Sequence, residues 1–235
     1  MDYLLRDGYF TGAEHAKIDH NRITNSFEVY KNKLALQSSA LVNFETMMIS
    51  RFQMFKAVYF HKTVRAGEVM LLEAMSLADD YLGLSKMNVE SYMIQTDDSI
   101  LQQLTSLPED TSELKAAKKI ATDYQDRKLF KCVFEKTISG KKSFGRNKLK
   151  QFREDIAKKS KLAESQIFID TSTTHSMPLA PSKKESSSII LIKKEGSKVI
   201  PKTIPISEIP LVSSMSGKMN ILRAYTQQKN RNKVE

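Results

Sequence analysis

The sequence predicts a mainly α-helical protein that carries an α+β lobe at its C-terminal end. Apolar residues recur every three or four positions through most of residues 38–125, which is the spacing of helices that bury one face. After about residue 126, short runs rich in β-branched and aromatic residues replace this pattern. We therefore expect residues 1–125 to form a helical part with one hairpin, and residues 126–235 to form an α+β lobe with a basic surface.

The elements near the N-terminus are predicted to be short. Residues 2–7 have the pattern of a short helix, and a polar segment follows them. Residues 27–30 and 34–36 alternate apolar with polar side chains on either side of a Lys-Asn-Lys turn. This arrangement predicts a small hairpin near residues 27–36 that turns at Asn32.

Two long helices are the clearest periodic features of the chain. The first begins at Ser38 or Ser39, either of which can cap it, and places apolar side chains at helical spacing as far as Tyr59. The second spans about residues 63–82 and repeats the pattern. It ends at Gly83, the residue type favoured directly after a helix C-terminus.

Three shorter helices complete the helical part. They are expected near residues 89–95, 97–106 and 111–128. Asp97 or Asp98 is the expected cap of the second of these helices, and Asp110 or Thr111 lies near the N-terminus of the third. The predicted cap residues are typical because their side-chain oxygens accept hydrogen bonds from free first-turn amides.

The C-terminal lobe is predicted to mix strands with helices. Strand-like runs cover residues 128–138, 166–171 and 188–194. Helices are expected at residues 146–160, where the pattern is amphipathic and basic, and at about residues 216–228. Prolines and serines indicate a loop over residues 172–187, and three prolines limit residues 199–212 to short extended pieces.

The positive charge is concentrated in the second half. The chain has a net charge of +10, yet residues 1–107 hold 10 basic and 13 acidic side chains, whereas residues 108–235 hold 27 and 14. Clustered cations bind polyanions by releasing counterions, so nucleic acid is a possible partner; a lysine-rich solvated surface explains the charge equally well. The candidate cations are Lys141, Lys142, Arg146, Lys148, Lys150, Arg153, Lys158, Lys159 and Lys161.

Several classes of protein and site are disfavoured. The single cysteine, Cys132, excludes an intrachain disulfide and a cysteine-based zinc site. The N-terminus has no signal-peptide pattern and no run of 18 apolar residues occurs, so we expect a cytoplasmic protein without a membrane partner. His15 and His20 share a polar segment with Glu14 and Asp19, but spacing does not bring the histidines of the chain together as metal ligands.

Specific motifs give a stronger indication than composition. They are MDYLLRD at residues 1–7, Arg51 followed by YFHK at residues 59–62, ADDY at residues 78–81 and LFK at residues 129–131. In this order and spacing they resemble HD-superfamily phosphohydrolases, in particular the dNTP triphosphohydrolases related to the mammalian sterile-alpha-motif and HD-domain enzyme. The resemblance implies the C-terminal part of an HD-domain helical core joined to a small mixed sheet.

The resemblance also implies a chemistry and a missing part. In the family a divalent metal (Mn, Mg, Fe or Zn), held by a His, a His-Asp pair and a later Asp, activates water for attack on a phosphate group. The match would place the last of these ligands just before Met1, and it makes Asp2 a helix-surface carboxylate instead. We therefore expect the C-terminal portion of a nucleotide phosphohydrolase that binds no metal cofactor by itself and is inactive alone. The alternatives are an oligomerisation or polyanion-binding module, and a gene product without an independent role.

The resemblance assigns substrate contacts to four residues. Tyr3 and Asp7 would face the nucleotide sugar, Arg51 would contact phosphate, and Tyr59 would pack against the sugar or base. A structural reading competes for each of them: the tyrosines can be core aromatics, and Arg51 can pair with Glu45 or Asp7.

The residues after Tyr59 bear on specificity and regulation. Phe60 stands where the family can carry Gln, which leaves contacts with the base open. His61 and Lys62 match positions that in some relatives contact a regulatory nucleotide at a subunit interface. A homo-oligomer is expected because loss of half a helical core would expose apolar faces, including Met47, Met48, Phe52 and Phe55.

Overall fold

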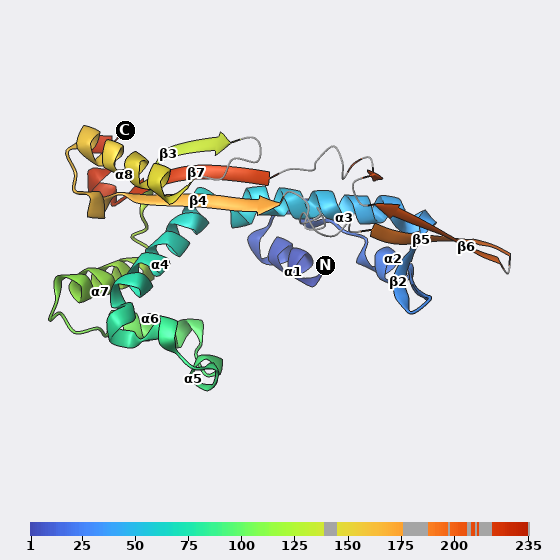
Figure 1. Cartoon of the computed structure of the whole chain (residues 1–235), viewed down its shortest axis with the longest axis horizontal. Helices are drawn as coiled ribbons and strands as arrows, with labels where there is room; N and C mark the ends of the chain where they lie inside the picture. The colour runs from blue at the N-terminus through green and yellow to red at the C-terminus, as the bar shows by residue number, and fades with distance from the viewer. Residues whose placement is uncertain are drawn as a thin grey trace. The chain divides into compact units, whose positions relative to one another are not determined.

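The computed structural model describes residues 1–138, 145–175, 188–196, 198–205, 208–209, 211 and 218–234 (Figure 1). Its helices are α1 (Asp2–Thr11), α2 (His20–Thr24), α3 (Leu41–Met54), α4 (Lys62–Leu82), α5 (Val89–Met93), α6 (Asp97–Thr105), α7 (Ser112–Gln125), α8 (Arg146–Ser160) and α10 (Arg231–Val234). Its strands are β1 (Phe27–Tyr30), β2 (Lys33–Gln37), β3 (Lys131–Ile138), β4 (Phe168–His175), β5 (Ser188–Glu195), β6 (Lys198–Pro205) and β7 (Lys218–Thr226). The predicted class, mainly α with small mixed sheets, is confirmed.

The chain folds into two compact units that interleave along the sequence. The first comprises Met1–His61, Thr137–Ser143 and Ser172–Asn220. The second comprises Lys62–Lys136, Phe144–Thr171 and Ile221–Glu235. These units differ from the ranges 1–125 and 126–235, which remain a prediction about domains.

The first unit contains the hairpin, and the hairpin belongs to a larger sheet. β1 and β2 pair antiparallel around Lys31 and Asn32, whose φ angles are 48° and 59°. Positive φ at both central residues is the geometry of the tight turns that suit the twist of a hairpin. β2 also pairs parallel with β5, and β5 pairs antiparallel with β6, so the sheet order is β1-β2-β5-β6. Sequence pattern alone did not predict the parallel pair, since it joins segments about 150 residues apart.

Two apolar clusters hold the helices of the first unit. Leu36, Phe44 and Met48 pack with Leu191 and Ile209, so one face of α3 lies against the four-stranded sheet. A second cluster consists of Leu4, Ile18, Ile23 and Met54 and fixes α1 and α2 near the end of α3. Met48 is therefore buried within the chain, although the sequence predicted an exposed apolar face there.

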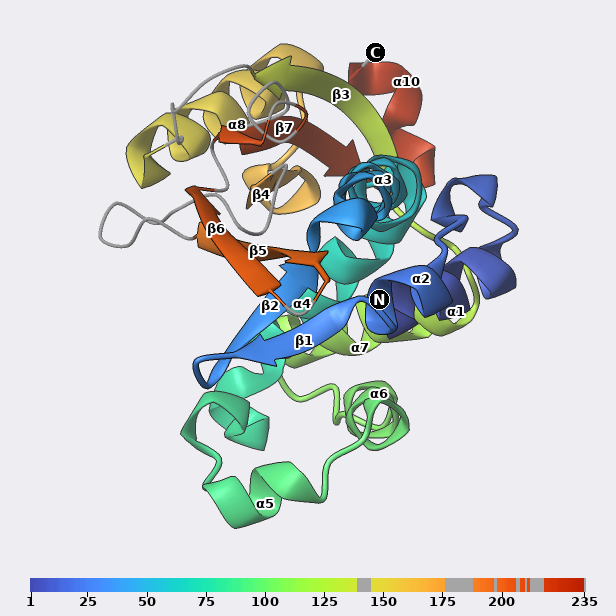
Figure 2. The ribbon, with the colours of Figure 1, turned by 90° about the vertical axis from the view of Figure 1, so that its right-hand side faces the viewer.

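The second unit is built around α4. Its core joins α4, α6 and α7 to Phe130, Phe168 and Tyr225. Phe130 directly precedes β3, whereas Phe168 and Tyr225 belong to β4 and β7. These three strands form a sheet in the order β3-β7-β4 (Figure 2). Gly67 permits close helix packing, because a Cβ at this position would lie 3.1 Å from the ring of Tyr124. No helix in the described part of the chain is long and apolar enough to cross a membrane.

Three local predictions are corrected. The helix expected at residues 216–228 is instead strand β7, the central strand of its sheet, with residues 220–226 all buried. This run is buried on both faces and includes the polar residues Asn220, Arg223 and Thr226, so it lacks the alternation of apolar and polar side chains that identifies a half-buried strand. β6 is also longer than expected, because an edge strand tolerates Pro201 and Pro205, whose backbones lack a donor. The cap of α6 is Thr96 rather than Asp97 or Asp98.

Other boundaries agree or shift slightly. α8 has the predicted bounds, and α4 ends as predicted at Gly83, whose φ is 66°. α1 continues past residue 7 and ends before Gly12, which has a φ of 68°. Of the loop expected at residues 172–187, the first four residues extend β4 and the others lie outside the described residues.

Candidate functional site

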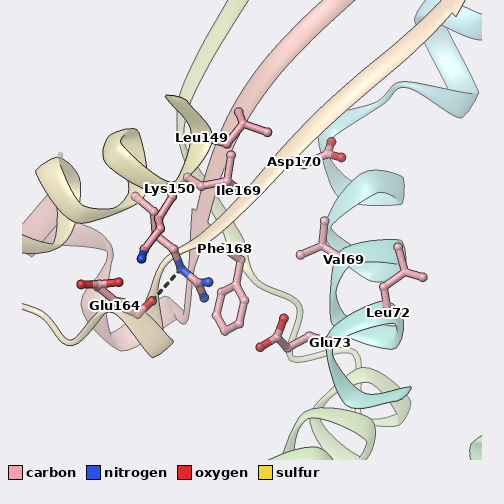
Figure 3. Close-up of a pocket in the computed structure, with 10 residues that line it drawn as sticks. Val69, Leu72, Glu73, Leu149, Lys150, Glu164, Phe168, Ile169 and Asp170 are labelled. Atoms are coloured by element: carbon pink, nitrogen blue, oxygen red, sulfur yellow. Dashed lines mark hydrogen bonds between the residues drawn. The ribbon is translucent and has the colours of Figure 1, made fainter. Parts of the chain in front are cut away.

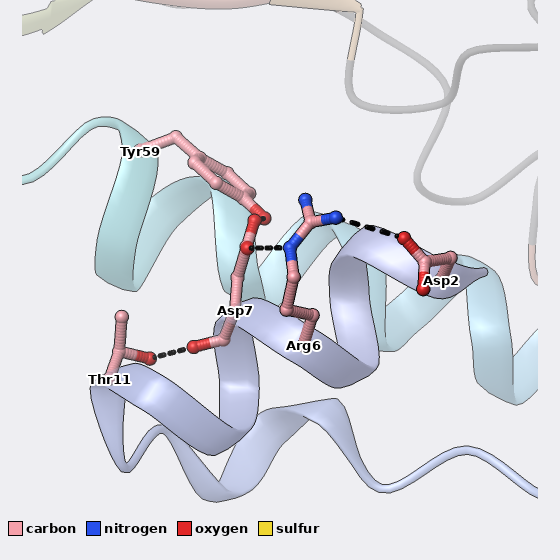
Figure 4. Close-up of polar contacts among 5 residues, drawn as sticks. All are labelled: Asp2, Arg6, Asp7, Thr11 and Tyr59. Atoms are coloured by element: carbon pink, nitrogen blue, oxygen red, sulfur yellow. Dashed lines mark hydrogen bonds and ion pairs between the residues drawn. The ribbon is translucent and has the colours of Figure 1, made fainter.

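Three of the four residues expected at the substrate site meet where α1 packs against the end of the long helix. Tyr3 and Asp7 lie four positions apart and so share one face of α1. The Tyr59 hydroxyl, which Figure 4 shows next to the Asp7 carboxylate, donates a hydrogen bond to Asp7 Oδ2 at 2.6 Å. The ring centres of Tyr3 and Tyr59 are 6.2 Å apart. Residues 52 positions apart in the sequence thereby form one polar and aromatic cluster.

The Asp7 carboxylate is held from two sides. Its second oxygen accepts a hydrogen bond from Arg6 Nε at 3.3 Å, and Arg6 Nη1 also contacts Asp2 at 3.0 Å. Thr11 Oγ1 donates to the Asp7 backbone carbonyl at 2.6 Å (Figure 4). The Asp7 side chain keeps 27% of its surface exposed, so the ordered carboxylate still has room to accept a hydrogen bond from a ligand. Asp2, by contrast, is 86% exposed and lies on the helix surface.

Tyr59 is held as a neutral donor. Partial burial disfavours the phenolate and raises the pKa of Tyr59 well above its usual range, and the Asp7 carboxylate raises it further. The phenol therefore stays protonated at physiological pH. The Asp7 carboxylate in turn accepts hydrogen bonds from Tyr59 and Arg6, which use part of its capacity as an acceptor.

A π-helical turn places the aromatic side chains of this cluster. Residues Phe55–Tyr59 follow α3 as a π-helix, and the Phe60 amide donates to the Phe55 carbonyl at 2.7 Å. The Phe55 ring lies 4.7 Å from that of Tyr59. π-turns inside helices occur frequently at functional sites. Sequence reasoning treated Phe55 only as an apolar position, although its spacing of four from both Arg51 and Tyr59 put it on their face.

Arg51 extends this aromatic row and is incompletely paired. Its guanidinium carbon lies 4.3 Å from the centre of the Phe55 ring, in a cation–π contact. Its Nη1 is buried and has no hydrogen-bond partner. Within the described residues, Arg51 forms an ion pair with neither Glu45 nor Asp7, so the interior pairing considered as the alternative is absent. A buried unpaired guanidinium N–H is costly, and an anionic oxygen would satisfy it with a strong bond.

The residues after Tyr59 have different surroundings. Phe60 is buried and its ring packs edge to face against Phe55 at 5.8 Å. His61 and Lys62 are exposed, and the Lys62 backbone carbonyl accepts a hydrogen bond from the Tyr225 hydroxyl at 3.1 Å. A regulatory nucleotide at His61 and Lys62 remains a prediction.

The described residues do not fit a divalent metal site. Among them, no group of three or more His, Cys, Asp or Glu side chains converges. Asp19, one of the acids near His15 and His20, caps α2 by accepting a hydrogen bond from the Arg22 amide at 2.9 Å. We accordingly derive no catalytic step through a metal from these residues.

The basic candidates divide into two groups. Arg153 donates through Nε to two backbone carbonyls, and Lys150 lies 3.9 Å from Glu154. Lys148, Lys158, Lys159 and Lys161, in α8 and at its C-terminal end, are exposed, as is Lys150. Lys141, Lys142 and the side chain of Arg146 lie outside the described residues.

Comparison with known proteins agrees with the fold and the motifs. The family model described as "HD associated region" matches residues 18–234. The chain is 29% identical over 171 residues to the deoxynucleoside triphosphate triphosphohydrolase SAMHD1 homolog of Dictyostelium discoideum, a match covering 72% of this chain and 32% of that protein. The chain spans about a third or less of the length of the curated relatives it matches.

Two solved structures share the fold. A hypothetical protein from Aquifex aeolicus aligns with a TM-score of 0.67 at 21% identity, over 100% of this chain and 56% of its own. A phosphohydrolase from Bacteroides thetaiotaomicron aligns with a TM-score of 0.61 at 20% identity, over 97% of this chain and 60% of its own. The chain therefore belongs to the family of HD associated regions, and it resembles HD-superfamily phosphohydrolases of the dNTP triphosphohydrolase group.

Proposed function

We propose that this chain supplies one wall of the nucleotide site in an HD-domain phosphohydrolase, and that the nucleotide is a deoxynucleoside triphosphate. The observation that carries the proposal is Arg51 Nη1, which is buried without a hydrogen-bond partner. The Phe55 ring contacts both the Arg51 guanidinium and the Tyr59 ring, and so links Arg51 to the Tyr3–Asp7–Tyr59 cluster. The substrate in the name of the Dictyostelium relative supports the choice of nucleotide.

Each residue of the site then has a distinct part in binding. Arg51 would bind a phosphate oxygen through its planar guanidinium, which the Phe55 ring holds in place. Asp7, oriented by Arg6 and Tyr59, would accept a hydrogen bond from a sugar hydroxyl. The tyrosine rings would pack against the sugar or base. These contacts bind and orient the nucleotide, and they move no proton.

Nucleotide titration of the whole chain tests the proposal. We expect saturable binding of dATP by calorimetry, weakened about tenfold or more in Arg51→Gln because a charge-assisted phosphate bond is lost. Lys56→Gln is the matched control, since Lys56 is an exposed cation on the same helical segment. Equal affinity in wild type and Arg51→Gln would refute the assignment of Arg51.

We also propose that the chain alone hydrolyses no nucleotide, because its described residues hold no fitting metal site. An assay of dNTP hydrolysis with added Mn²⁺ or Mg²⁺ should stay at background. Robust turnover that depends on Arg51 would contradict this part of the proposal and leave the binding assignment intact.

A second candidate function is binding of a polyanion, such as single-stranded nucleic acid, through the exposed lysines of α8. Lys148, Lys158 and Lys159 are exposed and no carboxylate in the described chain forms an ion pair with them. Binding of this kind should weaken steeply as salt is raised, because released counterions drive it. An affinity for single-stranded nucleic acid that does not change with salt would exclude this function.

A further inference from the structure

A pocket in the second unit shares no residue with the site described above. It is bounded by α4, by the first turns of α8 and by the segment from Glu164 to Asp170, and its volume is about 510 Å³ (Figure 3). All of its lining residues belong to the second unit, whereas Tyr3, Asp7, Arg51 and Tyr59 belong to the first. Its size is within the range of pockets that hold small molecules.

Arg153 is fixed in the wall of this pocket. Its Nε donates to the backbone carbonyls of Glu164 at 3.0 Å and Ile167 at 2.7 Å, which anchors one edge of the guanidinium. No carboxylate among the described residues forms an ion pair with Arg153. The Nη edge is therefore a positioned fork whose charge is not neutralised, which is the geometry that binds carboxylate or phosphate through two parallel hydrogen bonds.

Lys150 adds a second cation on the same face of α8. It lies three positions before Arg153, so the two side chains are neighbours on the helix surface. The Glu154 carboxylate is 3.9 Å away and the Lys150 side chain is 75% exposed, so this ion pair is weak. Lys150 therefore retains most of its attraction for an anion.

The acids near the pocket do not cancel these cations. Asp170 forms a bidentate ion pair with Arg65, at 3.1 and 2.5 Å. Figure 3 shows the Glu164 carboxylate directed away from Phe168 and Val69. Glu73 on α4 remains as an acid on the wall of the pocket.

The rest of the lining is apolar and rigid. Phe168 is 5% exposed and stacks on Phe130 with ring centres 4.3 Å apart, which holds it in one orientation. The apolar surface is completed by Val69, Leu72, Leu149 and Ile169 (Figure 3). An apolar body could contact these side chains while an anionic group is bound by the cations.

We propose that this pocket binds a small organic anion, with a phosphate or carboxylate group on Arg153 and Lys150 and an apolar body against Val69 and Phe168. The ligand chemistry follows from the Arg153 guanidinium, which is anchored, is not neutralised by a carboxylate and lies beside an apolar surface. The volume of the pocket suits a small molecule. This site is independent of the proposed nucleotide site.

The test is a titration of the whole chain with phenyl phosphate and, separately, with phenylacetate, in which NMR chemical shifts of the protein are measured at each ligand concentration. Benzyl alcohol, a neutral molecule with a similar apolar body, is the comparison probe. We expect saturable shifts for at least one anion and none for the alcohol at equal concentration. Comparison of the two anions distinguishes a phosphate from a carboxylate ligand.

Four variants make the test specific. Arg153→Gln should weaken binding of the anion about tenfold, Lys86→Gln at an exposed lysine outside the proposed sites should leave it unchanged, and Glu73→Gln should strengthen it. Arg153 also anchors backbone, so Leu72→Trp is the independent variant: it narrows the pocket from its exposed α4 wall and should reduce binding with Arg153 intact. Absence of saturable shifts in wild type, or full affinity in both Arg153→Gln and Leu72→Trp, would overturn the proposal.

Discussion

Tyr59 connects the two helices of the candidate site through a single hydrogen bond to Asp7. Both residues were expected at a substrate site because of the motifs around them, and the structure brings them within 2.6 Å. Sequence could not show that Asp7 is also held by Arg6, nor that Arg51 Nη1 would be left without a partner. Those facts depend on the side-chain conformations that packing selects, and residue types along a helix do not fix them.

Replacing Tyr59 by Phe tests this contact through pH. The folded-state pKa of Tyr59 is raised, so its contribution to stability is present below pH ~10, the ordinary pKa of tyrosine, and is lost as pH rises above it. Wild type should therefore lose stability above pH ~10 more steeply than Tyr59→Phe, by up to about 1.4 kcal/mol per pH unit. Chemical denaturation at a series of alkaline pH values measures the difference.

The control for this experiment is Tyr81→Phe, since Tyr81 is 60% exposed. At pH 7, Tyr59→Phe should also lower the free energy of unfolding by about 1 kcal/mol, because the partly buried Asp7 loses a donor. An identical alkaline slope in wild type and Tyr59→Phe would show that the hydrogen bond does not persist in solution.

At the scale of elements, sequence was most reliable where periodicity was long. α4 and α8 have essentially the predicted bounds because many turns share one apolar stripe. β7 was mistaken for a helix, since its buried central position removes the alternation that identifies a strand. The parallel pairing of β2 with β5 was missed because it depends on a contact between distant segments.

The cap of α6 is a second point where local rules allowed several answers. Thr96 and Ser99 form a reciprocal capping box, in which each side chain bonds the backbone amide of the other residue. We expect Thr96→Ala to lower the free energy of unfolding by about 1 kcal/mol. Asp98→Asn should cost only a few tenths of that, as it removes only an interaction with the helix dipole. Thermal denaturation measures both losses of stability. A larger loss in Asp98→Asn than in Thr96→Ala would show that the aspartate caps the helix.

Close packing of α4 against α7 gives a further prediction. Alanine normally stabilises a helix relative to glycine by about 1 kcal/mol. At Gly67, however, the added Cβ would lie 3.1 Å from Tyr124 Cε2, so we expect Gly67→Ala to lower the melting temperature. In a Tyr124→Ala background the same substitution should be stabilising. A gain in stability from Gly67→Ala alone would show that the Tyr124 ring moves freely.

At the scale of the whole molecule, one exposed apolar cluster lies outside the helix face for which the sequence predicted exposure. Met48 is buried, whereas Val89, Tyr92, Met93 and Ile94, in and just after α5, are each more than 70% exposed. Such a cluster favours association, so we expect sedimentation velocity to show oligomers at micromolar concentration. Met93→Glu should reduce association and the adjacent polar change Glu90→Gln should not. A monodisperse wild-type monomer would contradict the predicted homo-oligomer.

In the proposed site, Arg51 binds the phosphate of a nucleotide whose sugar lies against Tyr3 and Asp7. A crystal structure of the chain with dATP at saturating concentration tests it most directly. We expect a phosphate oxygen within hydrogen-bonding distance of Arg51 Nη1, with Tyr59 still hydrogen-bonded to Asp7. A nucleotide bound elsewhere, with Arg51 Nη1 still unpaired, would contradict it.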